Sequence, residues 1–390
     1  MLSVCACLLL AAQPGDDWQK QETVYLKNIK QVTHDYVRAG EGYFSPDGTK
    51  IIFQAEEKGE NPFYQMFVMD LKSGAARRVS TGAGKTTCGY FHPSKDKILF
   101  ASSHLDPDAK KHYAGEFKAR EEEKQTKKRR RYIWDFDPFM EIFEANLDGS
   151  GLKRLTDSKG YDAEGSYSAD GKQIVFCSNR TGEKDMELYI MDSEGKNVRK
   201  LTNAPGCYNG GPFFSPDGKK VIFRSDRKKK DHLQLYVINV DGSGEKALTD
   251  DENWVFWAPY WHRDGKHIIY TAADHSNPLL RPNYDLYWMR IDDKPKSTKA
   301  SQQGGFRHYA SELNPLFSTF ATSFESNLHP FCSEQKQPAP KKVRLTHFSG
   351  ADVLPVFSPD YRKIMWTSTR GGGFSSQLFI ADFVPPKGDD

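Results

Sequence analysis

A recurring pattern of turns and strands predicts an all-β fold, a six-bladed β-propeller of four-stranded antiparallel blades. A turn of the Ser-Pro-Asp-Gly type occurs six times, and an apolar triplet follows each turn at a constant distance. Where the repeat is uninterrupted, consecutive turns are 47 residues apart, and a period of about 40–50 residues is typical of one propeller blade. The six turns begin at Ser45, His92, Ser168, Ser215, His262 and Ser358.

Each turn joins the innermost strand of a blade to its second strand. Pro presets φ, Asp bonds the nearby backbone, and Gly takes the position with positive φ, as a hairpin connection requires. The β-branched and aromatic residues that follow fit buried strands. These triplets begin at Ile51, Ile98, Ile174, Val221, Ile268 and Ile364. We interpret the recurring turn aspartates as structural; they are Asp47, Asp170, Asp217, Asp264 and Asp360.

The third and fourth strands predict how the ring closes. A third strand of the Gln-Leu-Tyr-Val type also occurs six times, and an Arg-Leu-Thr-like fourth strand follows it in all copies except the last. Residues 30–33 precede the first turn and would supply the missing strand. Pairing of N-terminal with C-terminal sequence then leaves few open sheet edges. The alternative is a seventh, degenerate blade within residues 293–341, because residues 314–318 resemble an innermost strand.

On these turns and strands the chain resembles the TolB-like, or WD40-like PD40, propeller repeats over roughly residues 25 to 385. TolB itself has a separate α/β domain before its propeller, whereas the repeats here start almost at once. The same repeat resembles the propeller that precedes the catalytic domain of prolyl-oligopeptidase-like peptidases, but the sequence has no Gly-x-Ser-x-Gly motif. Some carbohydrate-active lyases of this type bind a metal through histidines, but the histidines here form no HExxH-like pair.

Composition and charge support one large domain, which we assign to residues 20–390. Hydrophobic residues make up 37% of the 390 residues, which is enough to bury several cores between blades. A net charge of +3 is too small to indicate nucleic-acid binding, and no apolar stretch is long enough to span a bilayer as a helix. We expect a monomer.

The first thirteen residues are apolar and end in small residues, like the core of a signal peptide, but they lack a cationic start. They predict a truncated or divergent signal peptide and a periplasmic or secreted protein; a short hydrophobic tail is the alternative. Four cysteines lie beyond this segment without metal-ligand spacing. We interpret them as buried free thiols, with a disulfide as the alternative; they are Cys88, Cys177, Cys207 and Cys332.

Two insertions interrupt the repeat. Residues 102–140 separate the second and third strands of blade two and contain a charged helical segment, which predicts a solvated helix with Glu–Lys pairs. A basic contact arm for an acidic partner is the alternative, and the aromatic residues 132–139 are expected to fold back onto the blade. Residues 293–341 separate the third and fourth strands of blade five. Such a long irregular connection is either functional or disordered.

The chain path places the loops between second and third strands on the same face as the connections between blades, which we call the crossover face. Connections between blades lead into the innermost strands, so the first residues of these strands should surround the central channel. These aligned positions, the collar, are Glu41, Cys88, Glu164, Gly211, Ala258 and Leu354. The candidate binding residues on and near the collar are Arg38, Glu41, Tyr161, Asp162, Glu164, Tyr208 and Trp257.

Acids, aromatics and an arginine around a concavity favour a binding mouth for a peptide or small cationic ligand. Alternatively, the aromatics pack between blades and the acids face channel water. We predict a non-catalytic scaffold that binds a protein or peptide over Glu41, Asp162, Glu164 and Trp257. No cofactor is predicted, although Asp162 and Glu164 could share a cation. The alternatives are a hydrolase or lyase acting in the channel, or the regulatory propeller of a separately encoded peptidase.

Overall fold

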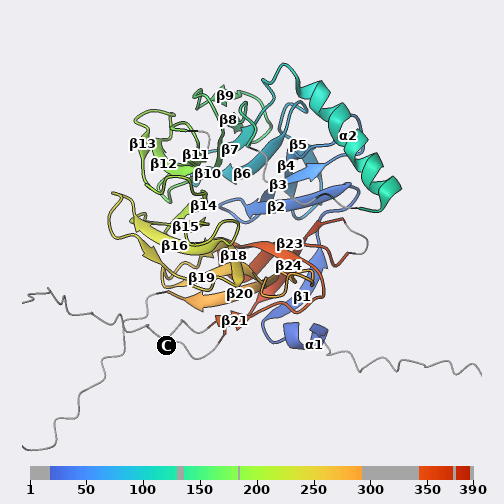
Figure 1. Ribbon diagram of the computed structural model, residues 1–390, viewed down its shortest axis with the longest axis vertical. Helices are drawn as coiled ribbons and strands as arrows, with labels where there is room; N and C mark the ends of the chain where they lie inside the picture. Colours follow the sequence, from blue (N-terminus) through green and yellow to red (C-terminus); the bar gives the residue numbers. More distant parts are fainter. Residues whose placement is uncertain are drawn as a thin grey trace, which may run out of the picture.

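The computed structural model describes residues 18–128, 130, 136–182, 185–291, 342–371 and 375–386. In this part of the chain, six four-stranded antiparallel sheets are arranged around a central axis (Figure 1). The predicted six-bladed propeller is therefore confirmed. The predicted signal peptide, Cys332 and the alternative seventh blade within residues 293–341 lie outside the described residues.

Blades one to five each follow the chain from the innermost to the outermost strand. Blade one contains β2 (Arg38–Phe44), β3 (Lys50–Glu56), β4 (Gln65–Asp70) and β5 (Ala76–Arg78). Blade two contains β6 (Thr86–Phe91), β7 (Lys97–Ser102), β8 (Glu141–Asn146) and β9 (Lys153–Arg154). Blade three contains β10 (Asp162–Tyr167), β11 (Gln173–Ser178), β12 (Glu187–Asp192) and β13 (Arg199–Lys200).

Blade four contains β14 (Asn209–Phe214), β15 (Lys220–Ser225), β16 (Gln234–Asn239) and β17 (Lys246–Ala247). Blade five contains β18 (Trp254–Trp261), β19 (His267–Asp274), β20 (Asp285–Arg290) and β21 (Lys342–Arg344). Blade six combines β22 (Asp352–Phe357), β23 (Lys363–Ser368) and β24 (Gln377–Phe383) with β1 (Leu26–Gln31).

The ring closes as predicted, because β1 pairs antiparallel with β24. The strand runs over Leu26–Gln31 rather than residues 30–33, but the next two residues continue the contact. The Val32 N–H donates to the Leu378 carbonyl at 2.9 Å, and the Thr33 hydroxyl accepts from the Leu378 N–H at 2.8 Å. The short helix α1 (Trp18–Glu22) precedes β1 and places Glu22 in a buried ion pair with Arg370, 2.9 Å away.

The repeated turns have the geometry that their sequence predicts. In the first turn the Ser45 hydroxyl donates to the Asp47 carboxylate at 2.5 Å, and the same carboxylate accepts the Thr49 N–H at 3.0 Å. The Ser–Asp bond recurs in the turns of blades three, four and six. These aspartates are thus held within their own turns. The second strands that follow form the most buried layer, with Phe53 and its equivalents at 0 or 1% exposure in all blades.

The insertion in blade two forms the charged helix α2 (Ala109–Thr126), which has no buried residue. It lies beside blade one (Figure 1), where Arg120 forms an ion pair with the buried Glu56 at 2.6 Å. The basic residue Arg130 pairs with Glu116 of the same helix at 2.9 Å. No helix in the described ranges is long and apolar enough to cross a membrane.

Closure of the ring by β1 leads to a stability prediction. Leu26 is fully buried in the core of blade six, so Leu26→Ala should lower the free energy of unfolding by about 2–5 kcal/mol. The matched control is Lys27→Ala on the exposed side of the same strand, which should change it by less than about 0.5 kcal/mol. Urea unfolding followed by tryptophan fluorescence measures both. Equal effects of the two substitutions would contradict a closing role for β1.

Candidate functional site at the channel mouth

Each innermost strand contains one β-bulge, and it falls at the collar position. The register against the second strand shifts there in all six blades. All six collar residues have positive φ, between 44° and 58°, which is uncommon for the five that are not glycine. A bulge redirects the side chain of a strand residue. Here the six collar residues line one cavity on the channel axis.

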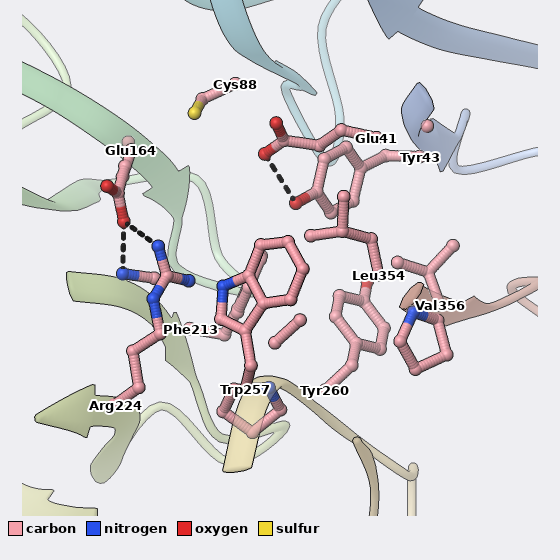
Figure 2. A pocket seen from close by; sticks show the side chains of 16 residues that line it. Glu41, Tyr43, Cys88, Glu164, Phe213, Arg224, Trp257, Tyr260, Leu354 and Val356 are labelled. Atoms are coloured by element: carbon pink, nitrogen blue, oxygen red, sulfur yellow. Dashed lines mark hydrogen bonds and ion pairs between the residues drawn. The ribbon is translucent and has the colours of Figure 1, made fainter. Parts of the chain in front are cut away.

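Two residues beyond the collar, aromatic side chains meet across the channel. Tyr43 of blade one lies 5.8 Å from Phe213 of the opposite blade four, measured between ring centroids. The hydroxyls of Tyr90 and Tyr260, from blades two and five, are 3.3 Å apart. These four rings form an aromatic floor. The space between collar and floor, which we call the funnel, has a volume of about 40 Å³ (Figure 2). It has room for a few water molecules or the end of one side chain.

One wall of the funnel is a hydrogen-bonded cluster around Glu164. Its carboxylate accepts bonds from the Arg224 guanidinium at 2.9 Å, the Tyr208 hydroxyl at 2.9 Å and the Gly211 N–H at 2.5 Å. Arg224 also donates to the Tyr208 hydroxyl at 2.6 Å and lies 5.7 Å from the ring centroid of Trp257. Glu164 and Arg224 are both buried. A buried ion pair is tolerated when further hydrogen bonds accompany it, and here the Tyr208 hydroxyl and the Gly211 N–H supply such bonds.

Gly211 is required by this cluster. A Cβ atom on this residue would lie 2.0 Å from an Arg224 guanidinium nitrogen, so a larger residue would push Arg224 away from Glu164. Gly211 is also the only glycine among the six collar residues. Arg224 lies on β15, and Gly211 follows its register partner Gly210 on the neighbouring strand β14.

Glu164 also fastens blade three to blade four. At two other blade boundaries the N–H of the collar residue donates to a threonine of the preceding blade: Glu41 to Thr367 at 2.9 Å, and Leu354 to Thr271 at 3.1 Å. The equivalent position of blade three is Cys177, which is a poor acceptor. The Gly211 N–H donates to Glu164 instead. This interaction gives Glu164 a structural role.

Glu41 faces the same funnel with far weaker partners (Figure 2). The Tyr43 hydroxyl is 3.3 Å from its carboxylate, and the Cys88 thiol is a second neighbour. Among the described residues, no basic side chain forms an ion pair with it. Burial, and after it the charge of Glu164, raise the pKa of Glu41 to about 7. The two acids lie two blades apart, as the sequence indicated, but the narrow funnel couples them electrostatically.

The structure brings four of the seven candidate residues together and places the other three elsewhere. Glu41, Glu164, Tyr208 and Trp257 surround the funnel or touch its wall. Asp162 is fully buried and engaged by two groups outside the funnel: the Arg180 guanidinium at 2.9 Å and the Ser158 hydroxyl at 2.8 Å. Asp162 and Glu164 therefore each have an arginine of their own.

The Asp162–Arg180 pair is a recurrent feature of the fold. The same contact joins Arg227 to Asn209 in blade four at 2.7 Å and Arg370 to Asp352 in blade six at 2.5 Å. It ties the first residue of an innermost strand to the loop after the second strand. Because the same contact occurs in three blades, we interpret it as a structural feature of the repeat.

Tyr161 and Arg38 also lie outside the funnel. Tyr161 is 2% exposed and packs in the core of blades three and four, with Phe136 of the insertion 5.5 Å away between ring centroids. Arg38 pairs with Glu56 at 2.7 Å and stacks over Tyr64 at 4.3 Å, below helix α2. Phe136 also lies 6.2 Å from Tyr208. This end of the aromatic segment thus folds back onto the blades as expected, and residues 132–135 lie outside the described ranges.

Sequence reasoning missed Arg224, although the sequence carries a signal for it. Arg224 directly follows the apolar triplet of blade four, inside a buried strand. The other five blades have uncharged residues at this position: Gln54, Ala101, Cys177, Thr271 and Thr367. A buried arginine at this position requires an acidic partner, and the nearest collar acid is Glu164.

The described cysteines and histidines add little to the funnel. Cys88, Cys177 and Cys207 are free thiols, and the first two are buried, as expected. Burial, with Glu41 second, raises the pKa of Cys88 well above its usual range, which makes it a poor nucleophile. Among the described residues, a group of donors close enough to hold a metal occurs outside the funnel, at the turn of blade five.

A family model for the TolB β-propeller domain (PD40) matches residues 183–284, in blades three to five. The match falls on turn and strand repeats of these three blades. The chain has the fold of the TolB-like propellers, and residues 183–284 match the PD40 repeat.

Known proteins resemble this TolB-like propeller in sequence or in fold. Dipeptidyl-peptidase 5 of Porphyromonas gingivalis is 44% identical over 46 residues, 12% of this chain and 7% of that protein. The chain spans less than half the length of each of three curated relatives that it matches. A protein of Agrobacterium tumefaciens solved as a candidate TolB has a TM-score of 0.51 and 15% identity, covering 89% of this chain and 91% of that one. For an oligogalacturonate lyase of Vibrio parahaemolyticus the TM-score is 0.50 and the identity 14%, over 92% and 93%. At these identities, the structural likeness shows the fold alone.

The raised pKa of Glu41 predicts an unusual pH dependence of stability. The pKa rises from its ordinary value of 4.5 to about 7 on folding, so the folded propeller binds this proton more tightly than the unfolded chain. The resulting stabilisation is complete below about pH 4.5 and is lost as the pH rises to about 7. It amounts to about 1–3 kcal/mol. Glu41→Gln should therefore be about 1–3 kcal/mol more stable than the wild type at pH 8 and similar to it at pH 4.5.

Urea unfolding of the wild type and of Glu41→Gln between pH 4.5 and 8 measures this difference. A difference that does not change with pH would refute the assignment. The control is Glu164→Gln, which leaves Arg224 buried without its counter-ion and should destabilise the propeller by about 3–5 kcal/mol across the range.

Proposed function

We propose that this TolB-like propeller is an exported, non-catalytic platform that binds a protein or peptide on its crossover face. One cationic or hydrogen-bond-donating group of the partner enters the funnel and contacts Glu41. The observation that carries this proposal is a funnel acid with a raised pKa whose neighbours are the Tyr43 hydroxyl and the Cys88 thiol, beside a second acid that has an arginine partner. The exported location rests on the signal-like first residues of the sequence.

The size of the funnel supports a side chain as its occupant. A volume of about 40 Å³ excludes a sugar ring or a threaded peptide but admits the end of a lysine or arginine side chain. A partner cation would also keep Glu41 ionised, because an opposite charge lowers the pKa of a carboxyl. Binding should therefore release a proton at neutral pH.

The surroundings of the funnel favour a macromolecular partner. Leu279 and Leu280 are 91% and 67% exposed in the loop between the second and third strands of blade five, on the crossover face. Phe136 on the same side is 37% exposed. Exposed apolar side chains of this kind mark interaction surfaces. Two lysines of the neighbouring blade-four loop are held by acids, Lys228 by Asp250 and Lys230 by Asp226, which lowers the positive charge that this loop presents to a cationic partner.

Catalysis in the funnel is the competing function. It is favoured by the pKa of Glu41, since a carboxyl that titrates near 7 suits a general base at neutral pH. A hydrolase or lyase would have to present its substrate above the collar, because the funnel is too small to admit one. The similarity to dipeptidyl-peptidase 5 supports a third possibility, a regulatory partner of a separately encoded peptidase.

Affinity capture from an envelope extract tests the platform. The baits are the wild type, Glu41→Gln, and the double variant Leu279→Ser, Leu280→Ser. We expect a stoichiometric partner on the wild type at pH 8, with affinity reduced about 10–100-fold by Glu41→Gln, as loss of one charge-assisted hydrogen bond predicts. The control is Asp241→Lys, a charge reversal on an exposed turn of the opposite face, which should leave capture unchanged.

The identity of the captured protein separates the alternatives. A hydrolase as the partner would favour the regulatory role. Equal capture by the wild type and Glu41→Gln would remove Glu41 from the interface. Absence of any partner, together with turnover of a peptide or polysaccharide substrate that Glu41→Gln abolishes, would establish the enzyme and overturn the platform.

A further inference from the structure

A second constellation of chemically active side chains lies at the opposite face of the propeller. It belongs to the turn between β18 and β19 of blade five, where His262 occupies the position that serine takes in four other blades. The turn sequence His-Arg-Asp-Gly is followed by Lys266 and His267. The chain thus brings two histidines and one aspartate into a single hairpin, away from the funnel.

The ligand atoms of these three residues converge. His262, Asp264 and His267 each offer one donor atom, and the three atoms lie within 4.8 Å of one another. The Asp264 Oδ2 atom is 3.0 Å from Nδ1 of His262 and 2.6 Å from Nδ1 of His267. The first approach is poorly aligned for a hydrogen bond, so the buried Nδ1 atom of His262 has no hydrogen-bond partner in the described structure.

The hairpin backbone fixes the carboxylate. Asp264 Oδ1 accepts the N–H groups of Lys266 at 2.8 Å and His267 at 3.0 Å. These bonds leave Oδ2 directed at the two imidazoles. The carboxylate is also partly open to solvent, with 33% of the side chain exposed, whereas the imidazoles are 14% and 13% exposed.

Aromatic packing holds both imidazoles in place. The His267 ring is stacked on Trp288, with centroids 4.7 Å apart and an angle of 13° between planes. The His262 ring meets Trp288, Phe357 and Tyr361 edge to face, at 5.2, 5.4 and 5.0 Å. Rings that are locked by packing lose little freedom on binding a ligand, so the site is preorganised.

The other turns of the propeller do not reproduce this arrangement. In the first turn the serine donates to the aspartate and satisfies it. Blade two also has a histidine in the serine position, but the residue two positions later is Ser94 rather than an acid, and Nδ1 of His92 accepts backbone N–H groups at 3.1 Å. His92 is therefore an internal control for a turn histidine whose Nδ1 atom is already engaged by the backbone.

We propose that His262, Asp264 and His267 bind a divalent first-row transition-metal ion such as Zn²⁺. Two imidazole nitrogens and one carboxylate oxygen are a donor set that suits such ions, with solvent in the remaining position. Ligand bonds of about 2.0–2.1 Å in a tetrahedral site separate neighbouring donor atoms by about 3.3 Å. Binding then requires the two short N–O distances to open by less than about 1 Å and Nδ1 of His267 to give up the proton it shares with Asp264.

The experiment is isothermal titration calorimetry of the tag-free, metal-stripped chain with Zn²⁺. We expect one ion per chain for the wild type, and at least a tenfold weaker affinity for His262→Ser and for His267→Gln. His262→Ser restores the residue of the other turns and so preserves the hairpin. Co²⁺ provides a second measurement, because a low-symmetry tetrahedral site gives visible d–d absorption that both variants should lose.

The control His92→Ser removes the other turn histidine and should leave Zn²⁺ affinity and the Co²⁺ spectrum unchanged. Circular dichroism confirms that each variant remains folded. Absence of Zn²⁺ binding by the wild type would overturn the proposal. So would binding that survives both His262→Ser and His267→Gln, since the ion would then be held by other residues.

Discussion

The bulge in each innermost strand is the constraint on which the site depends. A bulge turns a side chain toward the channel, but it also takes the N–H of that residue out of the strand ladder. A buried N–H without a partner costs about 1–3 kcal/mol, so an acceptor on the neighbouring blade stabilises the bulge. Threonine side chains do so at two boundaries. At the boundary of blades three and four the acceptor is Glu164, and the charge of this acid then shapes the whole funnel.

A charged acceptor in a closed space has two consequences. Glu164 needs a counter-ion, which Arg224 provides, and Arg224 needs space, which Gly211 leaves. Although it is paired with Arg224, Glu164 still disfavours a second negative charge nearby and helps to raise the pKa of Glu41. The aromatic floor adds to the effect by closing the channel, since a wider and wetter channel would solvate Glu41 and bring its pKa back toward 4.5.

The sequence was sufficient to predict the fold because each copy of the repeat contains the residue types that favour tight turns and buried strands. The turns, the apolar triplets and the unpaired last blade together predicted six blades and their closure. Alignment of the copies also located the collar, because equivalent residues of a repeat occupy equivalent places. The alignment could not show that the side chains of Asp162 and Glu164 lie in different surroundings. Two residues apart on a strand, they would normally share a face, but the bulge between Ala163 and Ser166 breaks that alternation. Asp162 consequently meets Arg180, whereas Glu164 points into the funnel.

Residues that differ from their equivalents in the other blades can be interpreted from the contacts that they form. Arg224 replaces the uncharged residues of the other five blades, and it pairs with Glu164 in the space that Gly211 leaves. His262 replaces the serine of four other turns, and Asp264 and His267 lie beside it. Glu41 also differs from the apolar or small residues of most collar positions, yet its partners in the described chain are the Tyr43 hydroxyl at 3.3 Å and the Cys88 thiol. Burial of a carboxyl with so little compensation is costly, and a protonated Glu41 reduces that cost only at the lower end of the pH range. Glu41, rather than the better bonded acids around it, is therefore the group on which the proposed partner would act.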